Sequence, residues 1–166
     1  AALEARAGEP ARRRLGLAAL LLSTALGQAV ASVDFNHAQA NREIALDLAG
    51  GLSRMGRRVF YTGHWGLQLY MDKAGAHPLD AARGGWDEPR LGDLVVVPKS
   101  NANMLKPART VFAEIRMVSA EHPVPLRLVC SPEDACQGAF FSSAWGFLPF
   151  ALSRKPIEEF TLFELK

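Results

Sequence analysis

The chain has 166 residues, 49% of them hydrophobic, with 19 Lys+Arg against 17 Asp+Glu and a formal net charge of +2. This length suits one domain with a real core plus an appendage, and it excludes two domains of ordinary size. The small net charge also argues against a nucleic-acid partner, since domains that bind nucleic acids are usually strongly basic.

The N-terminal residues 1–14 are a polar lead-in whose densest charge cluster is Arg12-Arg13-Arg14. Residues 1–11 have the character of a lead-in and not of a start, so one hypothesis is that the chain continues a longer protein. Because cytoplasmic flanks of membrane spans are rich in Lys and Arg, residues 1–14 are predicted to be cytoplasmic.

An uncharged run follows the arginines and covers residues 15–33 without Lys, Arg, Asp, Glu or His. A bilayer core needs about 20 such residues as helix, so the run predicts a transmembrane helix. Two alternatives stay open. The run has the layout of a cleaved signal peptide with Ala29-Val30-Ala31 as the cleavage site, and it also suits a buried helix of a soluble protein.

The next segment predicts helices around a short strand. Asp34-Phe35-Asn36-His37 predicts a polar break, with Asp34 or Asn36 capping the helix on its C-terminal side. Helical spacing then runs from Ala38 to Gly56, where a left-handed glycine is favoured. Residues 58–62 predict a strand stopped by Gly63, and residues 67–75 predict another helix.

The C-terminal half predicts mainly strands. Residues 76–89 read as a loop, and Leu94-Val95-Val96-Val97-Pro98 has the branched composition of a strand buried on both faces. Residues 111–119 slightly favour strand over helix, and residues 125–129 and 160–165 predict two more strands. The predicted fold class is α/β, a small open mixed sheet with flanking helices in residues 34–166, preceded by one N-terminal transmembrane helix.

Ligands of open α/β sheets tend to bind beyond the carboxyl ends of the strands. Two predicted strands end in loops that carry His64 with Trp65 and Lys99 with Asn101. If these strands are parallel neighbours, the four side chains converge, with an aromatic plate for a sugar face and polar groups for hydroxyls or a phosphate. In the structural alternative, Trp65 is a core anchor and His64 a satisfied hydrogen-bonding residue.

Other chemistry has little support in the sequence. The four histidines are scattered and the two cysteines lack a second pair, so no metal or cofactor is predicted. No catalytic residue can be assigned, and the pairs Glu133-Asp134 and Glu158-Glu159 are interpreted as solvated charges.

Two further stretches leave alternatives open. In an extracytoplasmic setting Cys130 and Cys136 are slightly favoured to form a disulfide over two free thiols. The aromatic residues 140–150, which include Trp145, suit core packing, a membrane-facing edge or a ligand wall.

Three stretches carry a resemblance to a known family. They are His64-Trp65-Gly66-Leu67-Gln68-Leu69-Tyr70-Met71-Asp72-Lys73-Ala74-Gly75, Leu91-Gly92-Asp93-Leu94-Val95-Val96-Val97-Pro98, and residues 141–150 with their Trp-Gly-x-x-Pro-Phe ending. In their order along the chain and in their residues, they resemble the C-terminal region of bacterial membrane glycosyltransferases akin to the dolichyl-phosphate-mannose protein mannosyltransferases. The resemblance covers roughly residues 12–166.

The resemblance implies a role for each part of the chain. Residues 15–33 would be the last spanning helix of a bacterial inner-membrane protein, and the α/β unit its periplasmic tail domain. Such enzymes transfer sugar from a polyprenyl-phosphate carrier to an acceptor, and their catalytic aspartate would lie upstream of Ala1. The alternative is a stand-alone anchored or secreted binding module without catalytic activity.

Overall fold

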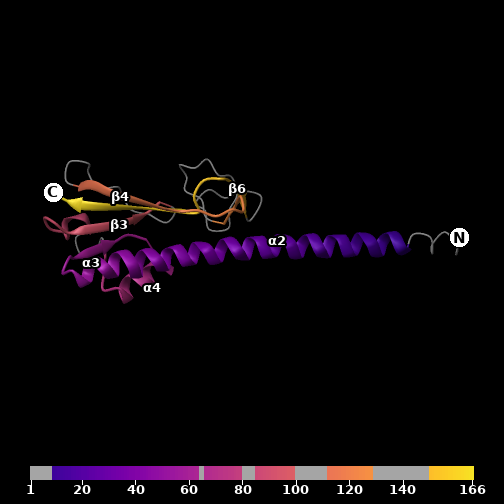
Figure 1. Ribbon diagram of the computed structural model, residues 1–166, viewed down its shortest axis with the longest axis horizontal. Helices are drawn as coiled ribbons and strands as arrows, with labels where there is room; N and C mark the ends of the chain where they lie inside the picture. The colour runs from indigo at the N-terminus through magenta and orange to yellow at the C-terminus, as the bar shows by residue number, and fades with distance from the viewer. Residues whose placement is uncertain (1–8, 64–65, 80–84, 100–111, 129–149) are drawn as a thin grey trace.

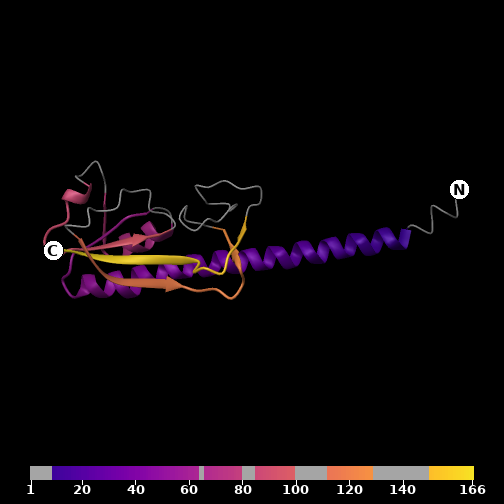
Figure 2. The same ribbon diagram turned by 90° about the horizontal axis from the view of Figure 1, so that it is seen from above.

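The computed structural model describes residues 9–63, 66–79, 85–99, 112–128 and 150–166. It consists of one long N-terminal helix and an α/β domain that is built around the helix's C-terminal half (Figure 1). Seen from above, the other half of the helix extends away from the domain as a straight rod (Figure 2).

The long helix comprises three segments without a break. They are α2 (Glu9–Glu43), the π-helical segment η1 (Ile44–Ala49) and α3 (Gly50–Arg54). Together they span 46 residues. The left-handed Gly56, with φ 78°, ends the helix, and the Arg57 N–H donates back to the Leu52 carbonyl at 3.1 Å. This is the glycine end that the sequence predicts.

The predicted break at residues 34–37 is wrong, because α2 runs straight through it. The polar side chains there bond to the helix itself: Asn36 Nδ2 donates to the Ser32 carbonyl at 2.8 Å, and Asn41 Nδ2 donates to the His37 carbonyl at 3.0 Å. No Gly or Pro interrupts this stretch. Its polar residues are therefore accommodated within a helix that tertiary packing stabilises downstream.

The main sheet has five strands in the order β2-β1-β3-β7-β4. β1 (Val59–Tyr61) pairs in parallel with both β2 (His77–Pro78) and β3 (Leu94–Pro98). β7 (Glu158–Leu165) is antiparallel to β3 and to β4 (Phe112–Ala120). The mixed sheet predicted from the sequence is thus confirmed, including the bounds of β3, while β2 lies in a segment that was predicted to be loop.

Four smaller elements complete the described structure. The helix α4 (Gly66–Lys73) follows β1, and a short 3-10 helix, η3, covers Gly85–Asp87. β5 (Leu126–Arg127) and β6 (Ala151–Leu152) pair with each other in a separate antiparallel sheet. The strand predicted at residues 125–129 therefore exists, but it belongs to a second sheet.

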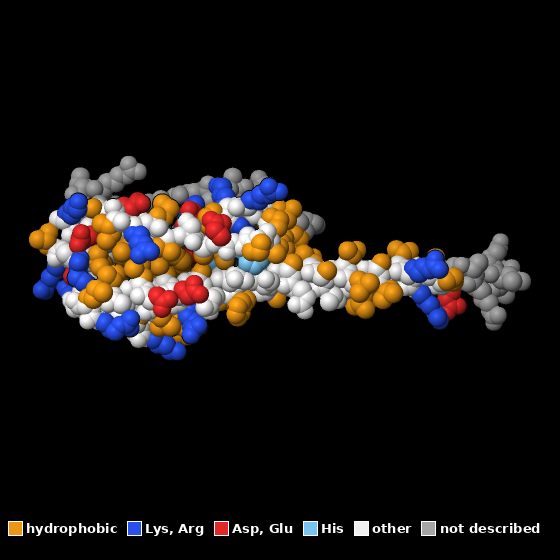
Figure 3. Space-filling model, viewed as in Figure 1, with side chains coloured by type: hydrophobic (Ala, Val, Ile, Leu, Met, Phe, Trp, Pro, Cys, Tyr) orange, Lys and Arg blue, Asp and Glu red, His pale blue; other side chains and the backbone are white. Residues whose placement is uncertain are grey.

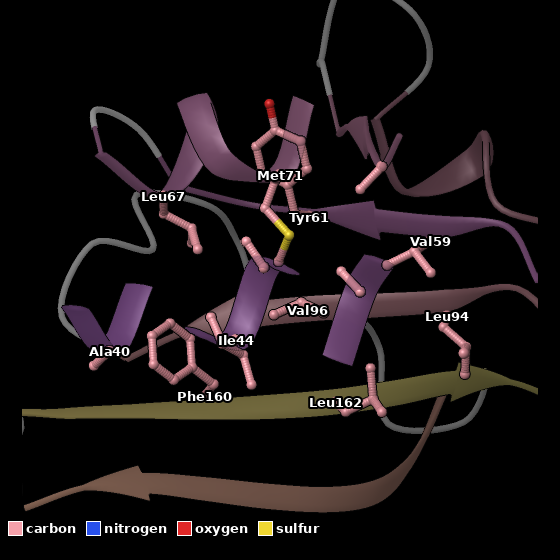
Figure 4. Close-up of a cluster of buried hydrophobic side chains, with 13 residues drawn as sticks. Ala40, Ile44, Val59, Tyr61, Leu67, Met71, Leu94, Val96, Phe160 and Leu162 are labelled. Atoms are coloured by element: carbon pink, nitrogen blue, oxygen red, sulfur yellow. The ribbon is translucent and has the colours of Figure 1, made fainter. Parts of the chain in front are cut away.

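The main core lies between the sheet and the helices (Figure 4). Alternate residues of the strands point to this face, so Val59 and Tyr61 of β1 meet Phe160 and Leu162 of β7 around Ile44. Phe60, Leu79 and Val95 form a cluster on the opposite face. Both faces of the central strands are buried, which explains the continuous apolar run of β3.

Candidate functional site

Three parallel strands end at one edge of the sheet. Tyr61 is opposite Pro78 of β2 and Val96 of β3, so the carboxyl ends of β1, β2 and β3 lie together. This confirms the parallel arrangement on which the predicted ligand site depends. His64, Trp65 and Asn101 lie outside the described residues, so the convergence itself stays a prediction.

The other predicted site residues also fall partly inside and partly outside the described ranges. Trp145 and the pair Cys130 and Cys136 also lie outside the described residues, so the ligand wall and the disulfide stay predictions. Lys99 is described, directly after β3. Its Nζ contacts the carboxylate of Glu159, and its N–H donates to the Glu159 carbonyl at 2.8 Å. The lysine therefore joins the end of β3 to the start of β7 through an ion pair that is only partly exposed.

Two further polar side chains lie at this edge and were missed in the sequence. Tyr61 is buried, and its hydroxyl donates to Asp72 Oδ1 of α4 at 2.6 Å. Burial, together with the Asp72 carboxylate, raises the pKa of Tyr61 well above its usual range. Thr62 is 2% exposed, and its Oγ1 has no hydrogen-bond partner among the residues that the structure describes. Both follow directly from the β-rich run before Gly63, which is the signal that could have found them.

The edge at which β1, β2 and β3 end is directed toward the apolar half of the long helix. β7 begins beside α2, where the buried carboxylate of Glu158 contacts His37 Nε2 at 3.2 Å. Since β3 is antiparallel to β7, β3 ends at this same level. His37 is four residues beyond Val33, so the strand ends lie about 6 Å along the helix axis from the end of the apolar run.

The interpretation of Glu158 as a solvated charge is wrong. Glu158 is 3% exposed and also accepts the Glu159 N–H at 2.9 Å. Its burial follows from strand alternation, because Glu158 is in phase with the core residues Phe160 and Leu162. That phase was visible in the sequence. Glu133 and Asp134 lie outside the described residues.

A groove of about 370 Å³ lies between the long helix and β4. Its apolar walls come from Ile44 and Leu48 on one side and Val118 on the other, and Glu43, Asp47 and Arg116 also line it. Figure 3 shows this surface as a hydrophobic band between acidic side chains on the helix and a basic side chain on the sheet. Its volume falls within the range of small-ligand pockets, and π-helical turns such as η1 recur at functional sites.

The N-terminal half of α2 presents an extended apolar surface. Its leucines are largely exposed: Leu15, Leu17, Leu20, Leu21, Leu22 and Leu26. By length and composition the helix is able to cross a membrane. Within the described ranges, no group of three or more His, Cys, Asp or Glu is arranged to hold a metal ion.

Comparison with known proteins adds no relative: no family model, curated protein or solved structure matches the chain. The candidate functional surfaces are therefore identified from the structure alone. They are an exposed apolar helix, a strand edge that faces along it, and a groove beside the π-helical turn.

Proposed function

We propose that the chain is a membrane-anchored extracytoplasmic α/β domain in which α2 crosses the bilayer and continues into the domain core. The observation that carries the proposal is the single helix with two surfaces. Leucines around its first half are exposed, whereas Ile44, Ala45 and Ala49 further along are buried. Exposure of apolar side chains to water is unfavourable, and burial of this half of the helix in a bilayer would remove that free-energy cost.

The same helix argues against cleavage after residues 29–31. Ala29 and Val30 pack against the cluster of Val33, Leu126 and Ile157. A cut at this point would remove part of the surface on which β5 rests. We therefore favour a retained anchor over a signal peptide. The Arg12-Arg13-Arg14 cluster supports an orientation with the domain on the extracytoplasmic side. Following the family resemblance, we propose that this is the periplasmic side of a bacterial inner membrane.

The finer proposal follows the family resemblance: the domain belongs to a glycosyltransferase-like membrane protein that uses lipid-linked sugar, with the catalytic part upstream of this chain. The strand edge supports it, since it faces the apolar half of α2 from about 6 Å beyond the run. A polyprenyl-phosphate sugar or a glycan acceptor at the membrane surface would lie close to this edge. In this proposal His64, Trp65, Lys99 and Asn101 contact the carrier or the acceptor.

The anchor is tested by expressing the full chain in a bacterium with alkaline phosphatase fused after Lys166. We expect a full-length product that resists alkaline extraction from membranes and has active phosphatase, which folds only outside the cytoplasm. A soluble product shortened by residues 1–31 would mean a secreted protein. An intact soluble product would mean that the apolar helix is covered in some other way.

The carrier-site proposal is tested by Trp65→Ala in the membrane-bound chain. We expect weaker binding of a polyprenyl-phosphate sugar or a glycan acceptor at an unchanged unfolding temperature. Parallel loss of binding and of folding would make Trp65 a core residue. Trp86→Ala is a matched control, because it removes the same ring at a position outside the two loops that carry His64 with Trp65 and Lys99 with Asn101.

The groove beside η1 favours a second candidate, an anchored binding module without catalytic activity. Its apolar walls with a charged rim suit an amphipathic ligand or peptide. Val118→Glu introduces a charge into this groove at a half-buried position. A loss of ligand binding with Val118→Glu but not with Trp65→Ala would support this candidate over the carrier site.

A further inference from the structure

The end of the domain nearest the apolar half of α2 is built from β5, β6 and their flanking residues, here called the β5–β6 unit (Figure 1). It contacts the helix within the uncharged run itself. Leu126 packs with Val33 and Ile157, and Ser32 Oγ lies 3.3 Å from His122 Nε2. The unit therefore covers one side of the last turns of the run.

The part of the uncharged run that precedes this contact is too short to cross a bilayer by itself. Residues 15–28, which precede the contact, amount to about 21 Å of helix, whereas the hydrocarbon core of a bilayer is about 30 Å thick. Only the whole run, residues 15–33, reaches about 28 Å. A bilayer that covers the run consequently extends to the level of the β5–β6 unit.

The exposed surface of the unit has the chemistry of a membrane interface. Leu152 is 75% exposed, although its cross-strand partner Leu126 is only 7% exposed. Pro123 and Pro125 are also exposed, and Arg154 and Lys155 lie exposed beside them. Figure 3 shows hydrophobic side chains gathered at this end of the domain with basic side chains next to them. Apolar residues flanked by Arg and Lys favour the boundary between acyl chains and phosphates.

Three backbone carbonyls in the β5–β6 unit accept hydrogen bonds from one buried side chain. The Arg127 guanidinium is buried and donates to the carbonyls of Val124 at 3.0 Å, Leu126 at 2.6 Å and Lys155 at 2.9 Å. Carbonyls without partners are costly in or near hydrocarbon, where water cannot satisfy them. One side chain thus satisfies three carbonyls at the end of the domain that is nearest to the bilayer.

We propose that the β5–β6 unit is a membrane-contacting surface: Leu152 enters the boundary of the leaflet on the domain's side, and Arg154 and Lys155 face lipid phosphates. This inference rests on the proposed crossing of the bilayer by α2. The occupant is the bilayer because the surface continues the apolar helix and carries basic residues. The contact gives the domain a second attachment besides its helix, and so restricts rotation of the helix and domain together about the axis of α2.

Photocrosslinking in the full chain, in membranes, tests the contact. Separate variants carry p-benzoylphenylalanine in place of Leu20, Leu152 or Leu91, and lipid adducts are detected by mass spectrometry. Leu91 is the matched control: it is 79% exposed, but it lies beside Gly92, whose carbonyl accepts from Arg57 beyond the far end of the helix. We expect lipid adducts at positions 20 and 152 and none at position 91.

The other outcomes separate the two proposals. Adducts at position 20 without adducts at position 152 would overturn the β5–β6 contact and leave the anchor standing. Absence of adducts at both positions would overturn the anchor as well. Adducts from position 152 to a protein would mean that a partner covers this surface, and equal lipid labelling at positions 91 and 152 would mean that the domain lies flat on the membrane. Either result would overturn the contact as proposed.

Discussion

The two halves of the long helix differ in what their apolar side chains contact. In the first half, leucines such as Leu20 and Leu22 are exposed on an uncharged stretch. In the second half the charges return, and the small residues Ala45 and Ala49 are fully buried against the sheet. The first half is apolar all round, whereas the second is apolar on one stripe only. The width of the apolar surface, more than the number of apolar residues, therefore distinguishes the two halves.

The largest expected effect is the difference between truncating one apolar side chain in the second half of the helix and truncating one in the first half. Ile44 is 6% exposed and Leu20 is 63% exposed. Ile44→Ala should lower the free energy of unfolding by about 2–5 kcal/mol through lost burial and a cavity. Leu20→Ala should leave it almost unchanged. Urea denaturation in detergent micelles, followed by circular dichroism, measures both, and equal losses would mean that the two halves are not different environments.

The link between α2 and β7 comes next in size. His37→Ala removes a hydrogen-bonding partner from the buried Glu158 carboxylate, so we expect a loss of about 1–3 kcal/mol in unfolding free energy. Gln39→Ala is the control on the same helix, since it removes only the exposed 2.8 Å bond to Glu43. Similar losses in the two variants would show that the His37 contact adds nothing beyond helix stability.

The smallest effect is expected at the strand edge. Tyr61→Phe removes the bond to Asp72 and should cost about 1 kcal/mol. Because the pKa of Tyr61 is raised in the folded state, the protein with Tyr61 should lose stability as the pH rises above about 10, where an unfolded tyrosine ionises.

The pH dependence of Tyr61→Phe has its own control. Tyr61→Phe should reduce the alkaline loss of stability. Tyr70→Phe is the control, because it removes a tyrosine hydroxyl other than the one bonded to Asp72. Denaturation curves at pH 8 and above, for all three proteins, measure the difference. An unchanged alkaline loss in Tyr61→Phe would assign it to another group.

Local patterns predicted the elements that depend on local chemistry. The branched run of β3, the helix before Gly56 and the helix after Gly63 follow from side-chain shape and backbone freedom. The predicted break at residues 34–37 was wrong, because a capping residue such as Asn also occurs inside a helix when its side chain bonds to a carbonyl of that helix and the flanking segments are helical. The two-residue strands β2 and β6 were not predicted, and β5 was predicted as a strand but not as part of a separate sheet, since such pairing depends on contacts far apart in the chain.

For the candidate site, the sequence indicated the edge but not its surroundings. The site hypothesis was conditional on β1 and β3 being parallel neighbours, which they are, and Lys99 was correctly located at the end of β3. Its ion pair with Glu159 was missed, because the register of an antiparallel strand about 60 residues away cannot be read from composition. The groove beside η1 was missed for a similar reason, since Arg116 and Glu43 come from distant parts of the chain.

An unbroken helix from the bilayer into the core of the domain would also act as a lever. From Val33 to the end of α3 the helix extends about 32 Å, so a change in tilt of about 20° would move its far end sideways by about 11 Å. Tilt responds to the thickness of the bilayer around a span. A domain mounted in this way would swing the end of the sheet farthest from the bilayer sideways as the lipid composition changes, while its strand edge, close to the pivot, would move much less.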